Sequence, residues 1–124
     1  DYQEASSLLK IDYRGWVSGL EKENLLRSAD CFILTSEDEN FAIAVAEAIC
    51  DGLPTIVSSN VAMHTFVQDH ETGWVISDLN ASELKNAILH VSANLEKYSL
   101  NAIGSAHLLS WEEVIYRWEQ VLKK

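Results

Sequence analysis

The sequence predicts an α/β fold, a Rossmann-like three-layer sandwich in which a parallel sheet lies between two layers of helices. Short apolar runs without polar alternation, such as residues 31–35 and 55–57, are typical of strands covered on both faces. Each run is followed by a segment of helical length, and alternating strands and helices favour a parallel sheet. A length of 124 residues fits a single domain. We expect several helices to follow the sheet.

Composition and charge exclude several classes of protein. With 48% apolar and 23% charged residues, the chain is not expected to be disordered. The formal charge of −10 would repel a phosphate backbone, so we expect no binding to nucleic acid. The apolar runs are too short to span a bilayer, and no basic and apolar leader opens the sequence. Cys31 and Cys50 lie in apolar runs and are interpreted as buried free thiols, which favours a cytoplasmic location.

The first part of the chain predicts helical segments around one β-prone run. Residues 2–9 have the composition of the end of a helix, and residues 11–17 form a short β-prone run that Gly15 interrupts. Residues 21–29 have the spacing of a helix. The buried strand at residues 31–35 follows directly, so this part ends in the first strand–helix alternation.

The central part predicts two further strands and two helices. Residues 41–50 are helical in length and composition, and Gly52, which a leucine and a proline follow, ends that helix. Strands are predicted at residues 55–57 and 73–77, with a short helix over residues 63–68 between them. The three strands therefore alternate with helices, as in a doubly wound sheet.

After the third strand the pattern changes to helices only. Asn80 is the predicted N-cap of a helix over residues 83–95, and residues 95–108 predict a weaker helix. Ser110 and Glu113 form a capping box that opens a last helix. The apolar stripe of that helix contains Trp111, Val114, Ile115, Trp118, Val121 and Leu122. If the stripe is exposed, we expect it to drive self-association of the chain.

Two carboxylates flank the start of the helix over residues 41–50. Ligands of parallel sheets sit beyond the carboxyl ends of the strands, where Glu39 is expected. Glu47 is the single charge on an otherwise apolar helix, so it either reaches solvent or points into a cleft. Eight residues of helix rise about 12 Å, roughly the span from the ribose to the hexose of a nucleotide sugar. The alternative is a solvated acidic turn that favours the helix dipole.

The segment from Ser36 to Pro54 resembles the donor-binding signature of retaining nucleotide-sugar glycosyltransferases of the GT-B fold, glycosyltransferase family 4. That signature has a serine, an acidic turn, two glutamates separated by seven residues, an alanine after the second glutamate, and Gly-x-Pro. The matching residues are Ser36, Glu39, Glu47, Ala48, Gly52 and Pro54. The resemblance continues on both sides, in the segment 13–17 and in the loop 69–73.

The resemblance implies a role for each matching residue. Glu47 would hold the ribose hydroxyls, and Glu39 would be the catalytic residue that holds the hydroxyls of the donor sugar. The backbone amides at the start of the helix would face the diphosphate, and the turn at residues 16–17 would contact the base. The implied donor-binding residues are Trp16, Val17, Glu39, Asn40, Phe41, Ala42, Ile43 and Glu47. No metal and no other cofactor is implied.

The resemblance also implies that the chain is part of a larger enzyme. We expect residues 1–124 to form one partial C-terminal nucleotide-sugar-binding domain, truncated at its N-terminal side and without an N-terminal acceptor domain. The arginine and lysine that neutralise the diphosphate in the family would lie upstream of Asp1. The partners implied are a UDP-, GDP- or ADP-linked sugar and, for the full-length hexosyltransferase-like parent, an acceptor glycan or lipid. The parent would be cytoplasmic or act at the inner face of the membrane, and the isolated chain would be inactive.

Three positions depart from the family pattern. Ala42 stands where glycine is usual, which makes close approach of a diphosphate harder. Val61-Ala62 replaces a common Gly-Gly, and Thr65 replaces a common glutamate. These departures favour an unusual donor or weaker binding, or, for Val61-Ala62, a loop that touches no ligand.

Two other functions remain open from the sequence. One is an epimerase with the same two-domain architecture, which would act on the nucleotide sugar without an acceptor. The other is a noncatalytic Rossmann-like module for scaffolding or assembly, in which the acidic turn serves only solvation. Binding of a nucleoside diphosphate that depends on Glu47 would separate the glycosyltransferase and the epimerase from the noncatalytic module.

Overall fold

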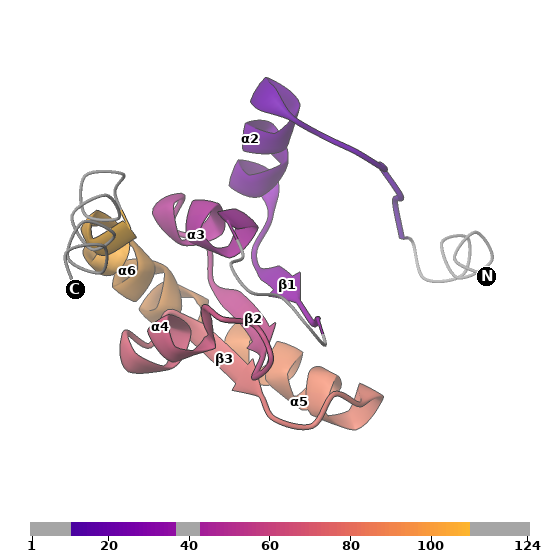
Figure 1. Ribbon diagram of the computed structural model, residues 1–124, viewed down its shortest axis with the longest axis vertical. Helices are drawn as coiled ribbons and strands as arrows, with labels where there is room; N and C mark the ends of the chain where they lie inside the picture. Colours follow the sequence, from indigo (N-terminus) through magenta and orange to yellow (C-terminus); the bar gives the residue numbers. More distant parts are fainter. Residues whose placement is uncertain (1–10, 37–42, 110–124) are drawn as a thin grey trace, which may run out of the picture.

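The computed structural model describes residues 11–36 and 43–109. At the centre of these residues lies a three-stranded parallel sheet with strand order β1-β2-β3 (Figure 1). Strand β1 spans Phe32–Leu34, β2 spans Thr55–Ser58 and β3 spans Gly73–Ile76. The predicted α/β class and parallel sheet are therefore confirmed. The helical segments predicted for residues 2–9 and from Ser110 onward, and the start of the helix predicted at Phe41, fall outside the described residues.

Five helices and one short 3-10 helix accompany the sheet. They are α2 (Gly19–Ser28), α3 (Ile43–Cys50), α4 (His64–Asp69), α5 (Ala81–Ser92), α6 (Leu95–Ser105) and η1 (Ala106–Leu109) among the described residues. Helices α3 and α4 connect consecutive strands of the sheet, and α5 and α6 follow the last strand. The predicted bounds agree with these to within three residues, which is ordinary fraying of helix ends.

Helices α3 and α4 cover one face of the sheet (Figure 1). The register places Leu34, Val57 and Val75 in one row across the three strands, and this row packs against the two helices. Val45 on α3 and Val67 on α4 are fully buried in the same core. Each such side chain contributes about 1.5–3 kcal/mol by leaving water. This core fixes α3 against the sheet.

Helix α5 covers the opposite face of the sheet. Ile56 and Ile76 point to this side and pack against Ala87 and Val91 of α5. Helix α6 follows α5, and Tyr98, near the start of α6, completes this second core. Further along α6, Ala102 belongs to the first core. Helices therefore lie on both faces, as the sequence predicts.

Local sequence explains where several elements begin and end. Gly52 has φ +76°, a left-handed conformation that favours glycine, and it ends α3 as predicted. Gly73 pairs with Thr55 across the sheet, and a Cβ at Gly73 would collide with the Thr55 backbone. The Asn80 side chain accepts a hydrogen bond of 2.8 Å from the Glu83 amide, which confirms the predicted N-cap of α5.

The structure corrects four expectations. Residues 11–17 form no strand; they run away from the sheet, where no strand of the described residues pairs with them (Figure 1). Strand β1 is not covered on both faces, because Ile33 is 41% exposed at one edge of the described sheet. Cys31 and Cys50 are free, but Cys31 is only half-buried and Cys50 is exposed at the end of α3. These errors share a cause, since an apolar run predicts burial without specifying which neighbour covers it.

Within the described residues, no helix combines the length and the apolar character needed to cross a bilayer.

Candidate functional site

Glu47, the second glutamate of the predicted site, lies in the second half of α3. Its side chain is 38% exposed, so the single charge of this apolar helix reaches the surface instead of the core. The Lys22 ammonium on α2 lies 2.6 Å from Glu47 Oε2. This ion pair joins two helices that flank β1 in the sequence. Because the Glu47 carboxylate is paired with Lys22 and half-exposed, α3 does not have to bury an isolated charge, which would be costly.

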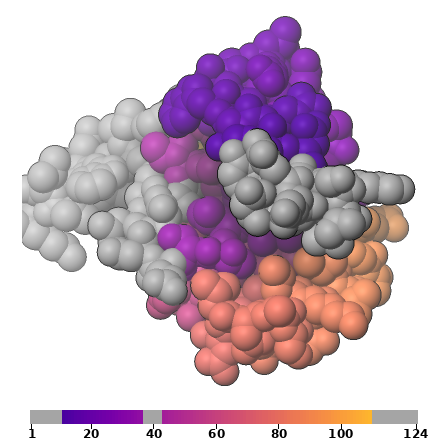
Figure 2. Space-filling view, turned by 90° about the vertical axis from the view of Figure 1, so that its right-hand side faces the viewer, coloured from indigo at the N-terminus to yellow at the C-terminus, as the bar shows by residue number. Residues whose placement is uncertain are grey.

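A cavity of about 380 Å³ lies between α2 and α3 beside this ion pair. Its lining residues come from one face of α2 and from the second half and end of α3. They are Gly19, Lys22, Glu23, Leu26, Arg27, Glu47 and Asp51. Because Glu47 lines this cavity, its carboxylate is open toward it, which is one of the two outcomes that its sequence context allowed. Figure 2 shows the N-terminal residues of the described part, in indigo, at one end of the molecule and α5, in orange, at the other.

The charges around this cavity oppose one another. Lys22 and Arg27 supply two positive charges, whereas Glu23, Glu47 and Asp51 supply three negative ones. A site with this balance gives little attraction to a diphosphate. Carboxylates accept hydrogen bonds and ammonium and guanidinium groups donate them, so such a wall is suited to a ligand rich in hydroxyl groups.

The other predicted site residues are placed unevenly by the structure. Ile43 is 52% exposed in the first turn of α3. Trp16 is 92% exposed and Val17 is half-buried, in the segment that leads into α2. Glu39, Asn40, Phe41 and Ala42 fall outside the described residues, so the predicted pairing of Glu39 with Glu47 stays a prediction.

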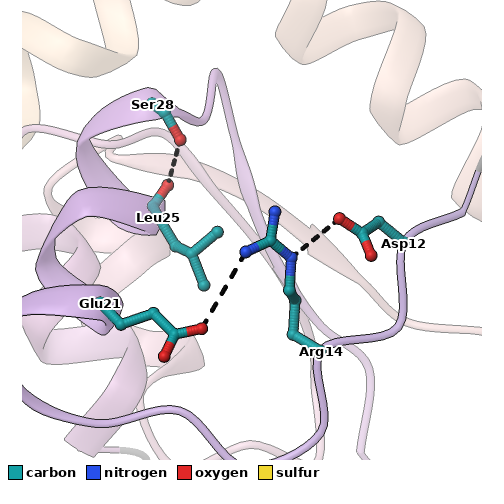
Figure 3. Close-up of polar contacts among 5 residues, drawn as sticks. All are labelled: Asp12, Arg14, Glu21, Leu25 and Ser28. Carbon is teal, nitrogen blue, oxygen red and sulfur yellow. Dashed lines mark hydrogen bonds and ion pairs between the residues drawn. The ribbon is translucent and has the colours of Figure 1, made fainter.

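Arg14 connects the segment of Trp16 to α2. Its Nε lies 2.8 Å from Asp12 Oδ2, and its guanidinium also approaches Glu21 Oε1 at 4.0 Å. Figure 3 shows the guanidinium between the two carboxylates, one from the extended segment and one from the first turn of α2. All three side chains are largely exposed, and such pairs contribute about 0–1 kcal/mol each. The segment is thus attached to α2 by polar contacts and not by a core.

Short polar contacts join the segments that follow the strands at the carboxyl edge of the sheet. Ser58 Oγ at the end of β2 donates to the Ser36 carbonyl at 2.6 Å, which ties together the segments that follow β1 and β2. Val61 is fully buried in the first core, and Ala62 is exposed. The His64 ring Nδ1 lies 2.8 Å from the Val61 carbonyl. The side chain of Val61 therefore serves packing, which favours the interpretation that it touches no ligand.

No cluster of three metal-ligating side chains occurs among the described residues. Burial, and to a lesser extent the Asp30 charge, raises the pKa of the Cys31 thiol from 9.0 to about 11. Burial raises the pKa of the Cys50 thiol too, assisted by the charges of Asp51 and Glu47. Neither thiol has the lowered pKa of a reactive nucleophile.

Sequence reasoning missed Lys22 and Arg27. It placed Glu47 correctly as a charge that must reach solvent or a cleft, because that follows from the apolar residues around it on one helix. Leu25 and Leu26 were expected to face inward, and both are half-buried, although no residue of α2 is fully buried. Lys22 lies three and four residues before them and is half-buried on the same face. That spacing marks the inner face of α2, but it does not show that this face meets α3.

Comparison with known proteins relates the chain to glycosyltransferases. The sequence model of a family described as "Glycosyl transferases group 1" matches residues 4–102. A D-inositol 3-phosphate glycosyltransferase of Geodermatophilus obscurus is 28% identical over 89 residues, which cover 72% of this chain and 20% of that protein. The alpha-1,3/1,6-mannosyltransferase alg-2 of Neurospora crassa is 30% identical over 83 residues, 67% of this chain and 18% of that protein. The chain thus matches about a fifth of the length of these relatives.

Proposed function

Since the chain belongs to the group 1 glycosyl transferases, we propose that it forms the nucleotide-sugar-binding part of a two-domain GT-B transferase of glycosyltransferase family 4. The complete enzyme would move a sugar from a nucleoside diphosphate to a hydroxyl of a glycan or lipid acceptor. The bond between the anomeric carbon and the diphosphate breaks, a bond to the acceptor oxygen forms with retained configuration, and the acceptor proton leaves with the released nucleoside diphosphate. The acceptor domain would be supplied by the longer protein.

One observation carries this proposal: Glu47, the second glutamate of the signature, opens onto a cavity of about 380 Å³. In the proposed complex its carboxylate accepts hydrogen bonds from the ribose hydroxyls, as a carboxylate can from two neighbouring hydroxyls. The cavity continues beside α2, which the segment of Trp16 and Val17 enters, and we assign the base to this side. Glu39 and the amides of Phe41, Ala42 and Ile43 would serve the sugar and the diphosphate.

The test is a titration of the 124-residue chain with UDP, GDP and ADP, followed by amide chemical shifts. We expect one nucleotide to bind with a Kd of about 1 mM, which is about 4 kcal/mol. The binding is weak because the diphosphate, which we assign to the amides of Phe41, Ala42 and Ile43, gains no attraction from the neighbouring cavity, where three carboxylates outnumber two cations. We expect no sugar transfer by this chain alone.

Two variants make the titration specific. Glu47→Gln keeps the shape of the side chain but removes the charge, and we expect it to weaken binding about tenfold or more, as for a lost hydrogen bond to a charged group. Glu83→Gln is the matched control, because Glu83 lies on α5, on the other side of the sheet. Equal binding by both variants, or the absence of binding by the unaltered chain, would refute the proposal.

A further inference from the structure

We propose that Lys22 is a second ligand-binding residue at this site and that, together with Glu47, it recognises two adjacent hydroxyl groups. The inference deepens the proposed function and rests on it, since that function supplies the ribose diol. Lys22 and Glu47 come from different helices, face the same cavity and lie 2.6 Å apart. Both side chains are 38% exposed, so neither is sealed away from a ligand.

The ion pair leaves part of both groups available. An ammonium group has three N–H donors and a carboxylate has about four lone-pair positions, and one contact between Nζ and Oε2 uses one of each. A hydroxyl can donate one hydrogen bond and accept another. One hydroxyl of a diol can therefore donate to Glu47 while its neighbour accepts from Lys22. The pair offers a diol both polarities at fixed separation, which a lone carboxylate does not.

The surrounding charges favour a neutral hydroxyl over a phosphate as the partner of Lys22. Glu23, Glu47 and Asp51 line the same cavity and outnumber Lys22 and Arg27. A diphosphate placed there would meet three carboxylates at close range, whereas a diol carries no charge to repel. Lys22 therefore acts in recognition of the nucleoside hydroxyls and does not replace the phosphate-neutralising residues of the family.

The test compares ribonucleotides with their 2′-deoxy counterparts on the 124-residue chain. The probes are UDP, GDP and ADP, each paired with its 2′-deoxy form, and binding is followed by amide chemical shifts. For the unaltered chain we expect the ribose form to bind about tenfold more tightly than the deoxy form. In Lys22→Met we expect the ribose form to bind more weakly, so that the ratio of the deoxy Kd to the ribose Kd falls to about 1. Lys22→Arg keeps a donor and should retain most of the preference.

The ratio of ribose to deoxy binding separates recognition from a structural role, because a loosened α2 would weaken both ligands alike. Lys85→Met is the matched control, because Lys85 is exposed on α5. Figure 2 shows α5, in orange, at the end of the molecule opposite the indigo residues. An unchanged ratio in Lys22→Met, with Glu47→Gln still defective, would overturn the role of Lys22 and leave the proposed function standing. Tighter binding by Lys22→Met would also overturn it, since Lys22 would then only block Glu47. Absence of nucleotide binding by the unaltered chain would refute both.

Discussion

The two cysteines show how one residue type takes different environments within a short distance along the chain. Cys31 precedes β1 and is half-buried, with its Sγ 3.7 Å from the Phe32 carbonyl. Cys50 ends α3 and is exposed. Burial is the larger cause of the raised pKa of Cys31, which reaches about 11. Since the thiolate is the reactive form, Cys31 is protected from modification because its side chain is half-buried and because its thiol stays protonated.

We expect a disulfide reagent at pH 8 to modify Cys50 first and Cys31 much more slowly, with the Cys31 rate rising steeply as the pH approaches 11. Because folding raises the pKa of Cys31, its contribution to stability is complete below pH 9 and is lost as the pH rises toward 11. The measurement is the reagent absorbance over time at several pH values. Cys50→Ser should remove the fast phase and leave the slow one. A fast phase that survives in Cys50→Ser would contradict this assignment.

Glu47 and Lys22 mark the limit of what single residues reveal in a sequence. Glu47 could be singled out because a charge among apolar helical residues has few stable placements, and the structure puts it at the mouth of a cavity. Lys22 shares the half-buried face of α2 with Leu25 and Leu26, but the sequence does not show which element that face meets. The first kind of residue is predictable from its neighbours in the chain. The second depends on contacts between elements.

At the scale of elements, the local signals were the most reliable. These signals act through residues that are adjacent in the chain. The structure has the expected N-cap at Asn80, the expected helix end at Gly52, and strands β2 and β3 at the expected apolar runs. The run at residues 11–17 has β-prone residues but pairs with no strand of the described residues. A strand needs a partner, and the sequence of one segment does not supply it.

We expect Asn80→Ala to destabilise the chain by about 1 kcal/mol. The Asn80 side chain satisfies the Glu83 amide at the start of α5, and alanine cannot. Urea unfolding followed by far-UV circular dichroism measures the change in the free energy of unfolding. Asn80→Ser or Asn80→Asp should restore most of the loss, because both keep a capping oxygen. An equal loss in all three variants would indicate that the amide nitrogen of Asn80, and not its capping oxygen, is the stabilising group.

At the scale of the whole molecule, two hydrophobic cores hold the sheet and most helices together, but they do not include α2. Among the described residues, β2, β3, α3, α4, α5 and α6 all contain fully buried side chains, whereas α2 buries none of its residues. Helix α2 is joined to the rest by its connection to β1 and by polar contacts such as that between Lys22 and Glu47. The proposed binding cavity is thus formed where a helix without fully buried residues meets a helix of the core. The α3 wall of this cavity was predictable in outline, whereas for α2 the inward face was predictable and its neighbour was not.

The net charge of the chain makes its stability depend on salt. A formal charge of −10 repels itself in the folded state, and added salt screens that repulsion. The ion pairs that Arg14, Lys22 and Lys97 form with carboxylates involve exposed side chains and are worth about 0–1 kcal/mol each, so screening them costs little stability. We expect the free energy of unfolding to rise by about 1 kcal/mol between 10 and 200 mM NaCl, which is about 4 °C in Tm.

Differential scanning calorimetry at these two salt concentrations measures the effect, and Lys85→Glu provides a charge control. That substitution removes one positive charge and adds one negative charge, which changes the formal charge from −10 to −12. Lys85 is exposed on α5, away from the proposed cavity, so the substitution alters the field with little effect on packing. The variant should be less stable at 10 mM NaCl and should gain more from salt than the unaltered chain. A Tm that falls with salt would mean that specific ion pairs outweigh the general repulsion, and Lys22 with Glu47 would then be the first pair to test.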